Sequence, residues 1–268
     1  MLKKASGVLA MVIAMSASGF AAAADKVTYQ LDWLPGGDKA PVYAGIQQGF
    51  FADEGLEVTV ASGRGSTDAI TKIATGQADI GSADIGALMA ARARDTVPVS
   101  AVYMIFNQGP HAFFSLSDSG IESFSDIAGK KVATSPFTSS NAFLPLVLEA
   151  NDMPGDAVSL TKSDPGALGP MLVTGNTDAI IAWVTNIALF KQQAAAAGKD
   201  INVIRWSDAG LSLYSSAVVA ADKFLSERPD VAQRFMRAYD KSLRFTHEHP
   251  ELAAADLHTM VPEVDAAV

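Results

Sequence analysis

The chain of 268 residues contains no cysteine. Disulfides, thiolate nucleophiles and thiolate metal ligands are therefore excluded. A lipid anchor of the kind that needs a cysteine directly after an export signal is excluded as well. Without disulfides, the fold has to be stabilised by a hydrophobic core, and a hydrophobic fraction of 49% is enough to fill one large domain or two lobes.

Histidine is also scarce, with four residues at His111, His247, His249 and His258. Three of them lie near the C-terminus without the spacing of helical metal ligands, so we expect no metal site. A Gly-x-Ser-x-Gly nucleophile elbow is missing, and His111 is the single histidine outside the tail. We therefore expect neither a catalytic constellation nor a cofactor.

Positive charge is in deficit, because the formal net charge is −9. An acidic surface argues against nucleic acid and against anionic membranes as partners. It does not argue against a small anion as ligand, because a local pocket can oppose the sign of the whole surface.

Long hydrophobic runs are missing except at the N-terminus. There Lys3 and Lys4 precede the apolar run 7–20, and four alanines at 21–24 supply the small residues of a cleavage site. This order predicts a cleaved export signal over residues 1–24, and the loss of its two lysines takes the net charge of −9 to −11. The run is too short for a membrane anchor. We expect a soluble mature protein in the periplasm.

The first part of the chain alternates strand and helix patterns. Strands are expected at 27–31, 56–60, 79–81 and 97–106, and helices at 40–51, 67–75 and 85–93. The pattern then restarts, with strands at 111–116, 131–133, 159–162, 178–183 and 202–206. Helical segments between them are expected at 125–128, 141–151, 166–174 and 187–197. The alternation predicts an α/β fold with helices on both faces of the sheets.

The tail returns with a strand at 214–220 and helices at 222–227, 230–247 and 250–260. We assign it to the first lobe, so the expected organisation is a first lobe over 25–107, a second over 108–208, and a return to the first over 209–268. The chain would cross between the lobes twice. It stops at Ala267-Val268 without a helix cap, and whether more of the protein follows stays open.

Five predicted strands end in loops of small polar residues, each followed by a helix. These loops span residues 32–41, 62–68, 81–86, 134–141 and 183–186. Taken singly, each is explained by ordinary helix capping. Their repetition favours another interpretation, because ligands of open α/β sheets bind outside the carboxyl ends of the strands. If the two lobes face each other, the loops converge on one cleft.

Roles follow from the side chains in these loops. Trp33 offers a stacking surface, Arg64, Ser66 and Thr67 would hold an anionic or carbonyl group, and Asp84 would accept from a ring amine. Ser139, Ser140 and Trp183 would close the cleft from the second lobe. The candidate ligand-binding residues are Trp33, Asp38, Arg64, Ser66, Thr67, Asp84, Ser139, Ser140 and Trp183.

Four segments resemble a known family. They are Leu31-Asp32-Trp33-Leu34-Pro35, the stretch 49–58 (GFFADEGLEV), the stretch 76–81 (GQADIG) and the stretch 124–132 (FSDIAGKKV). Together they are similar to solute-binding proteins of ABC transporters, in the group with nitrate, sulfonate, taurine and thiamine-precursor (pyrimidine) binders. The resemblance covers nearly all of the mature chain and does not single out one ligand.

The resemblance implies a type II-like periplasmic binding protein whose two α/β lobes close on one small molecule. It also implies an inner-membrane ABC permease as partner and a monomeric state. The Asp-Trp-x-Pro opening is closest to the thiamine-precursor branch, whose members often continue with asparagine and later histidine. Here Gly36 and Lys39 occupy those positions, so the ligand stays open between a flat heterocycle and a sulfonate- or nitrate-type anion.

Two other classes of function stay as alternatives. The same branch includes enzymes that make the pyrimidine precursor from their own histidine, and these resemble a cysteine-bearing pattern that this chain lacks. A ligand-sensing domain of a membrane receptor is the third hypothesis.

Overall fold

The computed structural model describes residues 23–266. The predicted export signal, residues 1–24, lies outside this range except for Ala23 and Ala24. Among the described residues, no helix combines the length and the apolar character that crossing a membrane requires.

The first of two sheets has five strands in the order β2-β1-β3-β10-β4. Strand β1 pairs in parallel with both β2 and β3, whereas β10 runs antiparallel to β3 and β4. The sheet is therefore mixed, and its C-terminal strand inserts between two strands from the first part of the chain. The bounds are β1 Asp25–Gln30, β2 Leu56–Ala61, β3 Ile80–Asp84, β4 Val99–Met104 and β10 Ser216–Ala221.

The second sheet repeats this plan in the order β7-β6-β8-β5-β9. Strand β6 pairs in parallel with β7 and β8, and β5 runs antiparallel to β8 and β9. The bounds are β5 His111–Leu116, β6 Lys131–Thr134, β7 Ser159–Lys162, β8 Ala179–Trp183 and β9 Ile201–Arg205.

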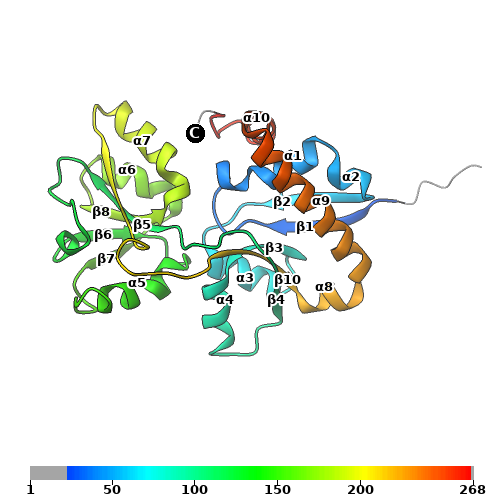
Figure 1. The fold of residues 1–268 in the computed structure, drawn as a ribbon, viewed down its shortest axis with the longest axis horizontal. Helices are drawn as coiled ribbons and strands as arrows, with labels where there is room; N and C mark the ends of the chain where they lie inside the picture. Colours follow the sequence, from blue (N-terminus) through cyan, green and yellow to red (C-terminus); the bar gives the residue numbers. More distant parts are fainter. Residues whose placement is uncertain (1–22, 267–268) are drawn as a thin grey trace, which may run out of the picture.

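Helices cover both sheets (Figure 1). In the first lobe α1 packs against α9 and α10, whereas α3 packs against α4. The first-lobe helices are α1 Ala40–Gln47, α2 Phe50–Asp53, α3 Ser66–Ala74, α4 Ile85–Arg92, α8 Asp222–Glu227, α9 Pro229–Glu248 and α10 Pro250–Met260, with the short 3₁₀ helix η1 Gly37–Lys39. Those of the second lobe are α5 Ser140–Glu149, α6 Leu168–Val173 and α7 Ile187–Ala196, with η2 Phe124–Ile127, η3 Pro165–Ala167 and η4 Val184–Asn186.

One expected helix is divided. The segment 40–51, predicted as a helix with its end at Gly49, forms α1 and α2, because Gly49 between them has a φ of 76°. This left-handed conformation ends α1 and is accessible to glycine without the penalty that a side chain would bring.

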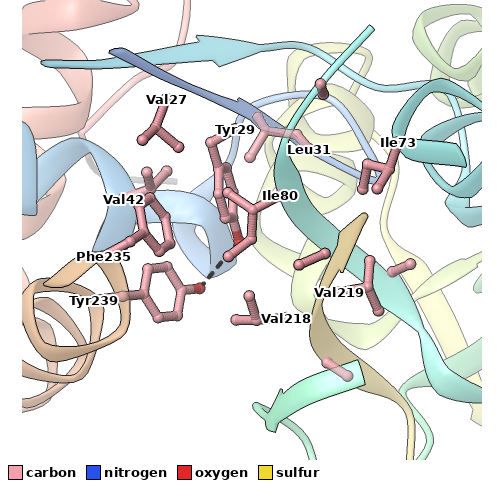
Figure 2. Packing of buried hydrophobic residues seen from close by; sticks show 14 of the residues in the cluster. Val27, Tyr29, Leu31, Val42, Ile73, Ile80, Val218, Val219, Phe235 and Tyr239 are labelled. Atoms are coloured by element: carbon pink, nitrogen blue, oxygen red, sulfur yellow. Dashed lines mark hydrogen bonds between the residues drawn. The ribbon is translucent and has the colours of Figure 1, made fainter. Parts of the chain in front are cut away.

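The core of the first lobe is built by alternate residues of β1 and by α9. Figure 2 shows Tyr29 of β1 between aliphatic side chains of the sheet and the aromatic rings of α9. Tyr29 is 1% exposed, and its ring stacks with Phe235 and Tyr239 at 5.7 and 5.8 Å between centroids. The Tyr29 hydroxyl donates to that of Tyr239 over 3.4 Å. This packing holds the end of β1, and with it the loop that follows, in one place.

The chain passes between the two sheets twice, over residues 105–110 and 206–215 (Figure 1). The two connections are hydrogen-bonded to each other, since Ser215 N donates to Phe106 O over 3.1 Å, and Ile105 N of the first connection donates to Ser216 O at the start of β10 over 2.8 Å. Two α/β lobes joined by two crossovers are the predicted fold class, which is confirmed.

Candidate functional site

A small pocket lies between the lobes at the carboxyl ends of the strands. Its cavity volume is about 10 Å³, which is room for about one water molecule. The structure is therefore a closed arrangement of the lobes. The lining residues are Asp32, Trp33, Asp38, Gly65, Ser66, Thr138, Ala182, Trp183, Thr185 and Asn186.

Four of the five predicted loops meet in this pocket. They follow β1, β2, β6 and β8, and each pair of strands is parallel within its sheet, β1 with β2 and β6 with β8. Parallel strands bring their carboxyl ends to one edge of the sheet, and the two edges face each other across the pocket. The sequence prediction that these loops converge on one cleft matches this arrangement.

The lobes meet directly at the rim of the pocket. Thr67 N donates to Phe137 O over 3.1 Å, and the Ser135 hydroxyl donates to Arg64 O over 2.7 Å. Gly65 is the closest approach, because a Cβ placed there would lie 2.1 Å from the Phe137 carbonyl oxygen. Its φ of 148° is open to glycine alone in practice. A glycine is therefore what lets the first lobe reach the second at this point.

Two tryptophans form the apolar part of the pocket, one from each lobe. Trp183 ends β8 and is 9% exposed. Trp33 follows β1, is half-buried, and packs against the second-lobe cluster around Phe114, Leu168 and Phe190. A ring that enters between the lobes would meet an aromatic surface from each side.

Next to the tryptophans lies a buried group of charges. The Lys39 ammonium is 2.6 Å from Asp32 Oδ1 and 2.8 Å from Asp38 Oδ2, and all three side chains are less than 10% exposed. Burial alone would lower the pKa of Lys39, but the Asp32 and Asp38 carboxylates outweigh it and raise that pKa well above its usual range. The ammonium also lies 5.2 Å from the centre of the Trp183 ring. Lys39 therefore stays charged and contacts Asp32, Asp38 and the Trp183 ring.

Asp32 has one oxygen satisfied and one without a partner. Its Oδ1 accepts from the Ser82 hydroxyl over 2.8 Å, and its backbone N–H donates to the same hydroxyl over 3.2 Å. Its Oδ2 is buried and has no hydrogen-bond partner. Since buried polar atoms are nearly always paired, Asp32 Oδ2 is an acceptor that the described residues leave without a hydrogen bond.

Asp84 lies elsewhere, at the hinge. It ends β3 and caps α4, with its Oδ1 accepting from Gly86 N over 2.8 Å. Its Oδ2 accepts from the Ser215 hydroxyl of the second crossover over 2.5 Å and lies 3.4 Å from His111 Nε2 of the second lobe. The side chain is fully buried.

A polar path joins the pocket walls through this hinge. Asp84 N donates to the Ser66 hydroxyl over 3.0 Å, and His111 Nδ1 lies 2.9 Å from the Ser140 hydroxyl. The Thr138 hydroxyl donates to that of Ser140 over 3.3 Å. Ser66 and Thr138 line the pocket from opposite lobes, so the 3.4 Å contact between Asp84 and His111, which is not a hydrogen bond, connects the two walls.

Of the residues predicted to bind ligand, Trp33, Asp38, Ser66 and Trp183 line the pocket. The others lie outside it. The Arg64 side chain is 54% exposed and pairs with Asp68 over 3.3 Å, while Thr67 is exposed. Ser139 and Ser140 are buried at the start of α5, and Ser140 serves the hinge path.

Sequence reasoning did not single out five residues of this region: Asp32, Lys39, Thr138, Thr185 and Asn186. All five stand within or next to the predicted loops. A buried lysine cannot be recognised from its own sequence context, although two aspartates within the seven residues before Lys39 were a usable signal.

The two lobes, two crossovers and interlobe pocket are the fold of periplasmic binding proteins. Among solved structures, the alkanesulfonate-binding protein SsuA from Xanthomonas axonopodis pv. citri bound to MOPS is similar with a TM-score of 0.73 and 14% identity. The similarity covers 92% of this chain and 81% of that one. At this identity the likeness establishes the fold.

Residues 37–253 match the NMT1/THI5-like family, and the chain belongs to it. It is 27% identical over 247 residues to the formylaminopyrimidine-binding protein of Halalkalibacterium halodurans, covering 91% of this chain and 73% of the relative. It is 24% identical over 249 residues to the 4-amino-5-hydroxymethyl-2-methylpyrimidine phosphate synthase of Aspergillus parasiticus, covering 89% and 71%. The family resemblance of the sequence motifs is confirmed.

Proposed function

We propose that the protein is the solute-binding component of an ABC importer and captures a small, flat organic nutrient between its lobes. The observation that carries the proposal is the pocket with Trp33 and Trp183 on opposite lobes at the carboxyl ends of both sheets. The relative from Halalkalibacterium halodurans, named as a formylaminopyrimidine-binding protein, supports the same class of function.

The mechanism is a ligand-dependent closure of the lobes. A cavity of about 10 Å³ cannot admit a heterocycle while the lobes stay as they are, so entry requires rotation about the two crossovers. We propose that residues 25–107 and 209–268 move as one body against residues 108–208. The ligand shifts the equilibrium toward closure by its differential affinity for the closed state.

Titration of the purified, refolded protein with flat heterocycles tests this proposal, with calorimetry and tryptophan fluorescence as readouts. Stacking on the two rings is expected to contribute strongly, so Trp33→Ala and Trp183→Ala each weaken binding about 10-fold. Tyr214→Ala is the control, because this ring is 61% exposed and lies outside the pocket. If all three variants bound the ligand with equal affinity, the pocket would not be the ligand-binding site.

The partner and the compartment belong to the same proposal. We infer export by the N-terminal segment, periplasmic localisation as a monomer, and delivery of the ligand to an inner-membrane permease. Fractionation of cells that express the full chain tests export and localisation, and light scattering of the purified protein tests the monomeric state. Ligand uptake that depends on both the permease and this protein tests the delivery.

An enzyme of pyrimidine-precursor synthesis is the second candidate, favoured by relatives such as the synthase of Aspergillus parasiticus. The two functions differ in what the protein does to a bound molecule. Product formation from any ligand, followed by mass spectrometry of the incubation, would establish the enzyme. Stoichiometric binding with unchanged ligand favours the transport component.

A further inference from the structure

The ring of Trp183 at the pocket is contacted by a cation and by two aromatic rings. The Lys39 ammonium lies 5.2 Å from the ring centre, and the rings of Phe106 and His111 lie at 6.2 and 5.8 Å between centroids. Lys39 belongs to the first lobe and Phe106 to the first crossover. His111 belongs to the second lobe, as Trp183 does. Of these three contacts, the one with His111 is therefore independent of how the lobes are arranged.

The second sheet places His111 directly opposite Trp183. His111 begins β5 and Trp183 ends β8, and the two residues are register partners in the antiparallel pair of these strands. Residues that oppose each other in this way project to the same face of a sheet and pack against each other. The two rings stand nearly perpendicular, at 88°, which is the edge-to-face arrangement that aromatic rings favour. The contact is therefore built into one sheet of one lobe.

The ring of His111 is itself held in place. His111 is 1% exposed, and its ring packs against those of Phe143 and Trp206, at 5.0 and 5.7 Å between centroids. Its Nδ1 lies 2.9 Å from the Ser140 hydroxyl oxygen. A buried side chain with such neighbours stays in one rotamer, because a close-packed interior leaves little room for another. His111 is therefore a rigid support for the ring of Trp183.

We propose that His111 is a positioning residue of the ligand pocket: its ring keeps that of Trp183 in the orientation for stacking while the lobes are open. This inference rests on the proposed function and adds a residue to it. When the lobes separate, Trp183 is expected to lose its contact with Lys39 of the first lobe and to keep its contact with His111. Because ordering a mobile side chain on binding costs free energy, a ring that is fixed beforehand is expected to bind the ligand about 3- to 10-fold more tightly.

The nitrogens of His111 have a separate role. Nδ1 lies next to the Ser140 hydroxyl, and Nε2 lies 3.4 Å from Asp84 Oδ2 of the first lobe without a hydrogen bond. These contacts concern the stability of the fold, because buried polar atoms need partners, whereas Trp183 is contacted by the ring. Substitution can therefore separate the two roles. His111→Phe keeps an aromatic ring opposite Trp183 and removes both nitrogens, and His111→Asn keeps a polar group and removes the ring.

The affinity for a ligand measures the role of the ring. In calorimetric titration with 4-amino-2,5-dimethylpyrimidine as the probe, His111→Phe is expected to bind within about 2-fold of the original chain, and His111→Asn about 3- to 10-fold more weakly. Both variants lose polar contacts of a buried histidine, so urea unfolding is expected to show reduced stability for both. His247→Asn is the matched control with unchanged affinity, because His247 is an exposed residue of α9 outside the pocket.

Fluorine NMR tests the same role without a ligand. The chain has three tryptophans, so protein labelled with fluorotryptophan gives three signals, and Trp183→Phe identifies that of Trp183. In His111→Asn the Trp183 signal is expected to broaden or split, because the ring samples several orientations. In His111→Phe it is expected to remain single and sharp. The signal of Trp33, which follows β1 in the other lobe, is the internal control.

The outcomes separate this inference from the proposed function. Unchanged affinity in His111→Asn, or an equal loss in His111→Phe and His111→Asn, makes His111 a structural residue and leaves the transport function standing. Absence of binding by the original chain overturns the proposed flat-heterocycle ligand, and the Trp183 signal then decides the positioning role. If His111→Asn does not fold, a broad or split Trp183 signal in His111→Phe overturns the positioning role, and a sharp one supports it.

Discussion

Two buried aspartates lie at the same edge of the first sheet: Asp32 follows β1, and Asp84 ends the neighbouring parallel strand β3. Asp84 is satisfied on both oxygens, by the amides of α4 and by the Ser215 hydroxyl, and faces the hinge. Asp32 is paired with Lys39 and keeps one oxygen without a partner at the pocket. Asp84 therefore has a structural role and connects the lobes, whereas Asp32 is a candidate for ligand contact.

The difference teaches how to separate the two roles. A carboxylate whose hydrogen bonds are complete has nothing left to offer a ligand, even when it stands in a loop that looks like a binding loop. A carboxylate with an oxygen that accepts no hydrogen bond can still accept one from a ligand. The substitutions below sharpen this contrast or break it.

The largest effect is expected at Lys39. Lys39→Met leaves two buried carboxylates without their cation, and loss of one partner of a buried ion pair costs about 3–5 kcal/mol of unfolding free energy. Urea unfolding followed by circular dichroism measures the change. Lys26→Met is the control, because Lys26 is 82% exposed and 4.0 Å from Glu57, and its effect is expected below about 0.5 kcal/mol. A loss at Lys39 as small as that would mean that the ion pair is hydrated.

The second effect concerns Asp84. Asp84→Ala removes the cap of α4 and leaves the Ser215 hydroxyl without its acceptor, so a loss of about 2–3 kcal/mol of unfolding free energy is expected. Asp84→Asn is expected to lose less, because asparagine caps a helix as well as aspartate does. The same unfolding experiment compares the two. If both variants were as stable as the original chain, the hinge role would be wrong.

The third effect concerns the closest contact between the lobes. Gly65→Ala would place a Cβ 2.1 Å from Phe137 O, and such overpacking costs about 1–3 kcal/mol. Since the contact exists in the closed arrangement, the ligand affinity is expected to fall about 10- to 100-fold. Gly76→Ala is the matched control, with a φ of 75° and open space around its Cβ position. It should lower stability and leave affinity unchanged, and a Gly65→Ala protein with full affinity would contradict the closed arrangement.

The smallest effect is a dependence on alkaline pH. Burial raises the pKa of Tyr239 to about 12, against about 10 in an unfolded chain. Between pH 10 and 12 the unfolded chain releases this proton while the folded chain retains it, so stability falls as pH rises. At pH 11 this difference in pKa is expected to lower the free energy of unfolding by about 1 kcal/mol. Unfolding of Tyr239→Phe, relative to the original chain at pH 8 and pH 11, isolates it, and Tyr214→Phe with its exposed ring is the control. An equal pH dependence in all three chains would refute the assignment.

The sequence alone determined the alternation of strands and helices, because apolar residues at period 2 or 3.6 and glycine or polar caps are local signals. The strand end at Trp183 was predicted correctly for this reason. It also determined that the polar loops after β1, β2, β6 and β8 stand at carboxyl ends. The helix end at Gly49 was predicted from the glycine itself, but α2 was not predicted as a separate helix.

Only the tertiary structure decided which of these loop residues meet. Asp84 and Asp32 look alike in sequence, but the insertion of β10 beside β3 brings Ser215 to Asp84, while the turn of η1 brings Lys39 to Asp32. Arg64, predicted to hold an anion, lies at an exposed rim because its neighbour Gly65 is the point where the lobes touch. A contact such as that of Asp84 with Ser215, 131 positions away, depends on chain topology, and no local pattern encodes it.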